Sequence, residues 1–129
     1  MQRIISWNVA SVRARMPVLV PFLRAEKPDF VFLQEIKATD ETFPFMDLQI
    51  EGYRAVISGQ KGYNGVAILA KENIRNIRDK LEGFEDQARF IQAETAGGIT
   101  LISVYVPNGN PPEKNPEDNS RFEYKLRWM

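Results

Sequence analysis

The 129-residue chain contains neither cysteine nor histidine. Without cysteine it can form no disulfide, no thiolate nucleophile and no cysteine-bound zinc site. Without histidine it can form no Ser-His-Asp triad, no imidazole general base and no HExxH metal site. Any chemistry must therefore come from oxygen and amide groups. These groups suit hard cations such as Mg²⁺, so a metal-assisted reaction at phosphate is the first class of function that fits.

The chain also lacks an excess of charge of either sign, because it has 17 basic and 17 acidic side chains. A basic site must therefore be local. Residues 1–37 carry six Lys and Arg against three Asp and Glu, and residues 61–80 carry five against two. These two blocks are either ordinary solvated surface or patches that converge on a phosphate backbone.

Long apolar runs are missing too. No stretch approaches the ~20 apolar residues that a membrane span needs, and the N-terminus lacks the apolar core of a secretory signal. We therefore expect no membrane partner, and we expect a cytoplasmic location.

Apolar runs alternate with turn signals in a way that predicts an α/β protein. Strands are expected at Arg3–Trp7 and at Asp29–Gln34, whose continuous apolar run is typical of a strand buried on both faces. A helix is expected within Met16–Glu26, with a late or kinked start because Pro17 and Pro21 interrupt it. The strand, helix, strand order predicts a parallel pair joined by a right-handed crossover.

Two hairpins are expected further along, each from two apolar runs separated by a glycine-containing turn. They are Tyr53–Ser58 with Gly65–Ala70, and Phe90–Thr95 with Ile99–Val106. A proline-rich loop is expected over Pro107–Asn119, and a helical pattern begins at Ser120.

The parallel pair would place Asn8 and Glu35 side by side at the carboxyl ends of its strands, where open α/β sheets bind ligands. A carboxylate just past a buried strand is costly unless it is paired or bound to a metal, and Asn8 offers an amide beside it. Taken alone, Glu35 can instead be a helix cap or an ion-pair partner of Lys37 or Arg13. Asn8 can be a turn residue. Tyr105 is either a packing residue or a phenol that meets a phosphate oxygen or metal-bound water.

Five short motifs occur in a fixed order along the chain: Ile5–Asn8 (ISWN), Val12–Arg15 (VRAR), Leu33–Lys37 (LQEIK), Gly62–Ala67 (GYNGVA) and Tyr105–Asn108 (YVPN). Together they resemble the exonuclease III type of AP endonuclease, within the endonuclease/exonuclease/phosphatase superfamily. The resemblance runs from residue 1 to the last residue, where Tyr124–Trp128 looks like the start of that family's next helix. DNase I, sphingomyelinases and inositol polyphosphate phosphatases share the Asn and Glu elements but not this whole run.

The resemblance implies a four-layered α/β sandwich of two mixed β-sheets packed face to face with helices outside. Residues 1–129 would be the N-terminal part of this single domain, truncated at the C-terminus, with one sheet and part of the DNA-binding rim. It also implies a hydrolase of base excision repair, an AP endonuclease and 3′–5′ exodeoxyribonuclease. Its cofactor would be Mg²⁺ or Mn²⁺, and its partner double-stranded DNA with abasic sites or 3′ ends.

Residue by residue, Glu35 matches the family's metal ligand, and Asn8 matches the amide that helps organise metal, phosphate and nucleophile. Tyr105 matches the active-site tyrosine. Five further positions match residues that contact DNA: Arg13, Ala14, Tyr63, Arg89 and Asn108. Arginines at such positions fix the register on the backbone without reading sequence, so binding should weaken steeply with salt.

Two departures from the family pattern affect these expectations. Ala10 stands where relatives often carry Asn or Asp near the metal. The family's Asp-x-Asn element, a further Asp and its partner His lie in the C-terminal half, and this chain has no histidine. We therefore expect a metal site open on one side and little or no nuclease activity from the chain alone. An exposed sheet face that favours dimerisation or aggregation is also expected.

Two alternative functions stay open at this point. The first is a non-catalytic chain that binds DNA weakly through Arg13, Arg15, Lys61 and Tyr63. The second is a phosphoesterase of the same superfamily that acts on small molecules or lipids, although the loops at Arg13 and Tyr63 favour DNA.

Overall fold

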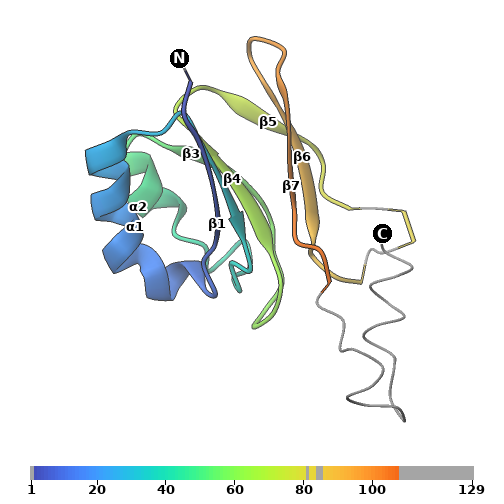
Figure 1. Ribbon diagram of the computed structural model, residues 1–129. Helices are drawn as coiled ribbons and strands as arrows, with labels where there is room; N and C mark the ends of the chain where they lie inside the picture. The colour runs from blue at the N-terminus through green and yellow to red at the C-terminus, as the bar shows by residue number, and fades with distance from the viewer. Residues whose placement is uncertain (1, 81, 84–85, 108–129) are drawn as a thin grey trace, which may run out of the picture.

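The computed structural model describes residues 2–80, 82–83 and 86–107. They form two β-sheets packed face to face, with two helices covering the outer face of one sheet (Figure 1). The strand orders are β1-β2-β4-β3 in the first sheet and β5-β6-β7 in the second. The predicted α/β class is confirmed. The expectation of a single sheet is wrong, because the chain leaves the first sheet after β4 and builds a second one.

The four-stranded sheet begins with the predicted parallel pair. Strand β1 (Ile4–Asn8) pairs in parallel with β2 (Phe30–Gln34). The first hairpin is also confirmed, since β3 (Arg54–Ser58) and β4 (Val66–Ala70) pair antiparallel. Strand β4 also pairs antiparallel with β2 and is buried along its whole length. Strands β2 and β4 are therefore the two central strands, and β1 and β3 lie at the edges.

Helix α1 (Val12–Glu26) connects the parallel strands and begins earlier than expected. It runs through Pro17 and Pro21 without interruption. The Ser11 side chain caps its first turn by accepting a hydrogen bond from the Ala14 amide at 3.3 Å. Both prolines are exposed and four residues apart, so they share the solvent side, where water can satisfy the carbonyls that lose a partner. The opposite side holds the buried residues Val12, Leu19 and Leu23.

Two elements were not predicted from the sequence. Helix α2 (Phe45–Ile50) has six residues, too few to show a clear helical period. Strand β5 (Ile74–Arg78) is exposed along most of its length, so it lacks the apolar alternation that marks a half-buried strand. Both elements are stabilised by packing on neighbours rather than by local pattern.

The second sheet contains the other predicted hairpin. Strand β6 (Phe90–Thr95) has the predicted bounds, and β7 (Thr100–Val104) is shorter than predicted at both ends. The two pair antiparallel, and β5 pairs with the other side of β6. The predicted helix from Ser120 and nearly all of the predicted loop before it lie outside the described residues.

The core has two parts, one on each face of the four-stranded sheet. On the helical side, Val31, Leu33 and Leu69 pack with residues of α1 and α2. On the other side, Phe30 and Ile68 pack with residues of the second sheet, including Ile91. The inner face of the first sheet is therefore covered, contrary to the exposed face expected from the sequence.

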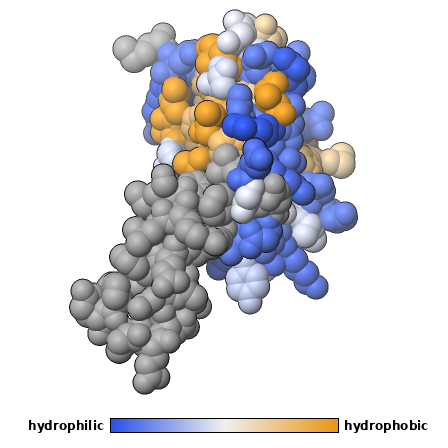
Figure 2. All heavy atoms as spheres, turned by 90° about the vertical axis from the view of Figure 1, so that its right-hand side faces the viewer, coloured by the Kyte–Doolittle hydropathy of each residue, from blue (hydrophilic) through white to orange (hydrophobic). Residues whose placement is uncertain are grey.

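An exposed apolar face does exist, on the outer side of the second sheet. Ile102 is 50% exposed, Ile77 is 42% exposed and Val104 is 40% exposed. Figure 2 looks onto this side and shows apolar side chains gathered among charged ones. Among the described residues, no helix is both long and apolar enough to cross a membrane.

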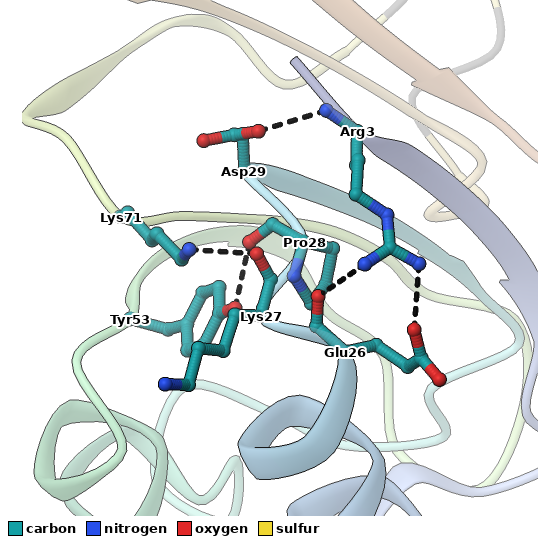
Figure 3. Close-up of polar contacts among 7 residues, drawn as sticks. All are labelled: Arg3, Glu26, Lys27, Pro28, Asp29, Tyr53 and Lys71. Atoms are coloured by element: carbon teal, nitrogen blue, oxygen red, sulfur yellow. Dashed lines mark hydrogen bonds and ion pairs between the residues drawn. The ribbon is translucent and has the colours of Figure 1, made fainter. Parts of the chain in front are cut away.

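Hydrogen bonds fix the start of the parallel pair, at the end of the sheet opposite the predicted site (Figure 3). The Arg3 amide donates to an Asp29 carboxylate oxygen at 2.8 Å. The Arg3 guanidinium donates to the Glu26 carbonyl and carboxylate, both at 2.6 Å. The end of α1 and the beginning of β2 are thus tied to β1.

The same turn is held from its other side (Figure 3). The buried Tyr53 hydroxyl donates to the Pro28 carbonyl at 2.6 Å, and burial raises the pKa of this phenol. The Lys71 ammonium donates to the Lys27 carbonyl at 2.6 Å. Because these bonds fix the start of β2, they also fix the position of Glu35, which directly follows its last residue.

Candidate functional site

The strands β1 and β2 end side by side, as the sequence predicted. Asn8 lies opposite Gln34 in the parallel register. Beyond the strands the pairing continues, because the Val9 amide donates to the Gln34 carbonyl at 3.0 Å and the Ser11 amide donates to the Glu35 carbonyl at 2.9 Å. The expected meeting of the two strand ends is confirmed, while the chemical roles of Asn8 and Glu35 stay predictions.

A short hydrogen bond joins the two sheets at this edge. The Tyr105 hydroxyl, just past β7, donates to Glu35 Oε1 at 2.7 Å. The other carboxylate oxygen, Oε2, is 3.7 Å from the Lys37 ammonium, and the Glu35 side chain is 22% exposed. Burial, followed by the hydrogen bond to Glu35, raises the pKa of Tyr105. The phenol is therefore a donor at neutral pH, and it fixes the orientation of the carboxylate.

Two polar residues behind Glu35 were missed by the sequence analysis. The Gln34 amide nitrogen donates to Ser6 Oγ at 3.2 Å and to Ser103 Oγ at 3.4 Å. Ser103 is buried on β7 and lies within 3.5 Å of the Leu33 carbonyl. They form a polar bridge between the sheets directly behind the site. The only signal for them in the sequence is a polar residue within each apolar run.

The loops at this edge share a rare backbone conformation. Six of the described non-glycine residues have a positive φ, and five of them lie at this end of the first sheet: Ala10, Ser11, Glu35, Lys37 and Asn64. Left-handed backbone at non-glycine residues is unfavourable and concentrates at functional sites, where the surrounding structure enforces it. The local conformation of Glu35 is therefore imposed by its neighbours.

Asn8 shapes the loop that follows β1. Its Oδ1 accepts a hydrogen bond from the Ala10 amide at 3.2 Å, which is the turn role considered for it. The side chain is exposed. The predicted role of its amide beside a metal or phosphate is compatible with this position, since Nδ2 does not take part in the turn.

Arg13 and Ala14 occupy the exposed first turn of α1. The Arg13 guanidinium lies 3.5 Å from the Lys37 carbonyl, so it reaches the loop that carries Glu35. Of the two ion-pair partners considered for Glu35, the structure shows Lys37. Arg13 is therefore close to the site without pairing with its carboxylate.

The loop of residues 59–65 lies against the same loop. Its carbonyls at Asn64 and Gly65 accept hydrogen bonds from the amides of Lys37 at 2.9 Å and Ile36 at 3.1 Å. Tyr63 is 71% exposed within this loop. Gly65 has φ +93°, and a Cβ there would lie 2.5 Å from Ile36 Cγ1, so only glycine fits.

Arg89, which precedes β6, also reaches the site. Its guanidinium carbon lies 4.8 Å from the centre of the Tyr105 ring. The structure thus brings together Asn8, Glu35 and Tyr105, with Arg13, Ala14, Tyr63 and Arg89 around them. The eighth predicted residue, Asn108, lies outside the described residues.

The donor set suits a hard cation that is only partly enclosed by protein. In the described part of the chain, no group of three or more His, Cys, Asp or Glu side chains is placed to hold a metal ion. Mg²⁺ is often bound by one or two carboxylates, with waters and substrate phosphates as the remaining ligands. Glu35, with the Asn8 amide nearby, fits such an open site and does not fit a closed protein cage.

Comparisons with known proteins agree with this arrangement. The chain matches the Endonuclease/Exonuclease/phosphatase family over residues 5–129. It is 39% identical over 115 residues to exodeoxyribonuclease III of Haemophilus influenzae, covering 83% of this chain and 42% of the relative. It is 30% identical over 133 residues to the DNA repair nuclease APEX1 of Danio rerio, covering 98% of this chain and 41% of the relative.

Solved structures show the same fold. An AP endonuclease from Archaeoglobus fulgidus superimposes with a TM-score of 0.87 at 38% identity, covering 99% of this chain and 48% of that one. The 3′ phosphatase NExo from Neisseria, bound to a product DNA hairpin, gives a TM-score of 0.84 at 35% identity over the same shares. The chain thus spans less than half the length of these relatives. Because the family match covers nearly all of the sequence, the chain belongs to the Endonuclease/Exonuclease/phosphatase family.

Proposed function

We propose that the whole protein containing this chain is a DNA repair nuclease that hydrolyses phosphodiester bonds with Mg²⁺ or Mn²⁺. The observation that carries the proposal is the 2.7 Å hydrogen bond from Tyr105 to Glu35, which holds a carboxylate at the joined ends of two sheets. The named activities of the relatives, exodeoxyribonuclease III and DNA repair nuclease, support it. The activity is proposed for the whole protein because the chain covers 42% of the first of these relatives.

Each residue of the site would have a defined task. Glu35 would hold the cation, while the Tyr105 hydroxyl and the Lys37 ammonium orient its carboxylate. The Asn8 amide would donate a hydrogen bond to a phosphate oxygen. The bound cation would supply Lewis-acid stabilisation of the charge that develops on the phosphate oxygens.

The proposed substrate is double-stranded DNA with abasic sites or 3′ ends. Arg13 and Ala14 at the start of α1 would lie against its backbone, with the Arg13 guanidinium contacting phosphate, because a cation at a helix N-terminus favours phosphate. The exposed Tyr63 would approach the groove near the lesion. A DNA-bound structure of the NExo relative supports this class of substrate. The role of Asn108 at phosphate and the cytoplasmic location stay predictions.

Other catalytic groups must complete the site. Among the described residues, the site offers the Glu35 carboxylate and the Asn8 amide oxygen, and no larger acidic cluster is present. No group among Asn8, Glu35 and Tyr105 is placed to activate water, since the Tyr105 hydroxyl is occupied by Glu35. We therefore propose that residues 1–129 form the N-terminal part of a larger catalytic domain and incise DNA little or not at all alone.

Manganese binding tests the metal site directly. Mn²⁺ titration of the chain, followed by electron paramagnetic resonance, should show one weak site that Glu35→Gln removes. Tyr105→Phe should weaken binding about tenfold, the usual size for losing a group that orients a ligand. Glu94→Gln is the matched control, because Glu94 is a surface carboxylate paired with Arg75. Unchanged binding in Glu35→Gln would refute the proposed metal ligand.

An incision assay tests the proposed incompleteness. The chain is incubated with an abasic-site duplex and Mg²⁺, and no cleavage is expected. Metal-dependent incision that Glu35→Ala abolishes would show that the 129-residue chain suffices. DNA binding that persists in Glu35→Gln, without Mn²⁺ binding by the wild-type chain, would instead favour a non-catalytic DNA-binding protein.

A further inference from the structure

We propose that Arg89 is a positioning residue for Tyr105, whose hydroxyl it holds against Glu35 by stacking on the phenol ring. The catalytic consequence rests on the proposed function, but the structural claim does not. The family resemblance implies a DNA phosphate contact for Arg89. The geometry instead assigns this side chain a task inside the protein.

Arg89 and Tyr105 contact each other through both backbone and side chain. They extend the β6–β7 ladder by one pair, next to Phe90 and Val104, because the Tyr105 amide donates to the Arg89 carbonyl at 2.8 Å. The Arg89 guanidinium donates to the Tyr105 carbonyl at 3.1 Å and lies 4.8 Å from the centre of its ring. This distance is within the range of a favourable cation–π contact. The two residues therefore behave as one unit.

The guanidinium is itself held in place. Its Nε donates to Gln87 Oε1 at 2.6 Å, while its terminal nitrogen donates to the Tyr105 carbonyl. These bonds use N–H groups that lie in the plane of the guanidinium, whose central carbon lies over the ring. A lysine ammonium has no plane to stack and cannot make both bonds in fixed directions. The arrangement therefore requires arginine.

The stack acts on the contact that carries the proposed function. A tyrosine side chain has two main torsions, so holding its ring also fixes its hydroxyl. The Tyr105 hydroxyl donates to Glu35, and the Arg89 guanidinium lies over the Tyr105 ring. Both Arg89 and Tyr105 are half-buried. Removing the guanidinium would free the ring to flip and would also loosen the first side-chain torsion, which is the one that moves the hydroxyl away from Glu35, so the carboxylate would lose a fixed donor.

The same sheet contains a matched control. The Arg78 guanidinium lies 5.1 Å from the centre of the Phe90 ring. This second contact has a similar distance, but Phe90 has no hydroxyl, and its pairing with Val104 places it on the opposite face of the sheet from Tyr105. Arg78→Met therefore removes an equivalent arginine–aromatic contact without touching the site.

Nuclear magnetic resonance of the 129-residue chain provides the first test. With ¹³C-labelled tyrosine rings and glutamate carboxylates, Arg89→Met should speed Tyr105 ring flips about tenfold, the size expected for losing one partly desolvated cation–π contact. It should also move the Glu35 carboxylate signal in the direction given by Tyr105→Phe. Arg89→Lys should not restore either signal, and Arg78→Met should leave both unchanged. If Arg89→Met fails to fold, Gln87→Met should shift the same signals by a smaller amount.

The salt dependence of DNA binding separates positioning from a phosphate contact. Loss of one phosphate contact lowers the slope of log K against log salt by about 0.9. For Arg89→Met we expect the wild-type slope on an abasic-site hairpin, together with the shifted Glu35 signal. A reduced slope with unchanged Tyr105 and Glu35 signals would overturn the inference. Shifted signals in a chain that binds neither DNA nor Mn²⁺ would refute the proposed function and still support the positioning role.

Discussion

At the scale of single residues, the position of a site residue can be predicted from the sequence where strand pairing alone determines it. The strand ends that carry Asn8 and Glu35 meet because parallel strands end at one edge, and apolar runs marked both strands. The contact of Tyr105 with Glu35 depends on how two sheets pack, which no local pattern contains. The stack of Arg89 on Tyr105 has the same origin. The sequence offered Tyr105 only as one of two alternatives, and only the resemblance pointed to Arg89.

Gly65 is a position where both backbone conformation and packing allow only glycine. Its φ of +93° is strained for any other residue, and a Cβ would lie 2.5 Å from the buried Ile36 side chain. We expect Gly65→Ala to lower the free energy of unfolding by roughly 2–4 kcal/mol, the sum of backbone strain and overpacking. Urea unfolding measures this loss.

Gly62→Ala is the control for Gly65→Ala. Gly62 has φ +75°, but nothing lies within 4 Å of a Cβ built there. Gly62→Ala should therefore lower the free energy of unfolding only by the cost of backbone strain, about 1 kcal/mol. Equal losses in the two variants would show that contact with Ile36 has no effect.

At the scale of elements, the sequence predicted the helices and strands whose apolar residues recur regularly. It missed the elements that are stabilised mainly by packing on their neighbours. Helix α1 was placed too late because two prolines were judged by local cost, whereas Ser11 caps the helix and one side of it is buried. Helix α2 and strand β5 were missed, since one is short and the other exposed. Their stability comes from tertiary contacts, which a pattern does not record.

The junction of α1 and α2 makes stability depend on pH. Arg24 on α1 donates to both Glu51 oxygens at the end of α2, at 2.7–3.1 Å. This hydrogen bonding lowers the pKa of Glu51. A carboxylate with a lowered folded-state pKa adds stability above its unfolded pKa, and the gain disappears as pH falls through the folded value.

We therefore expect Arg24→Met to be less stable than wild type at pH 7, with a difference that shrinks below about pH 4, near the pKa of an unperturbed glutamate. Urea unfolding at a series of pH values measures it. Glu51→Gln should remove the same pH-dependent part. A difference that stays constant down to about pH 2 would show that Arg24 stabilises by packing alone.

At the scale of the whole molecule, the described residues form a layer of helices and two sheets, with both faces of the first sheet covered. The sequence predicted the β6–β7 hairpin but not that it belongs to a second sheet, because local patterns do not record which distant strands pair and β5 carries no apolar alternation. The exposed apolar side chains lie on the outer face of β7, and not on the inner sheet face where exposure was expected (Figure 2).

This face leads to a prediction about self-association. Exposed apolar strands favour edge and face contacts between copies. We expect the chain to associate reversibly at high concentration, and we expect Ile102→Thr with Val104→Thr to shift it toward monomer while β-propensity is kept. Sedimentation velocity over a concentration series measures the change. Val18→Thr, on the exposed side of α1, is the control. An equal shift in that control would locate the contact elsewhere.

The cluster of left-handed residues beside Glu35 has a consequence for how this protein responds to selection. Each such position at Ala10, Ser11, Lys37 and Asn64 holds a conformation that costs about 1 kcal/mol outside glycine. Substitutions that relax these loops would raise melting temperature while loosening the carboxylate. Screening for thermal resistance alone would thus enrich variants at this edge of the molecule, and the most stable variants would be those that weaken the proposed metal site most.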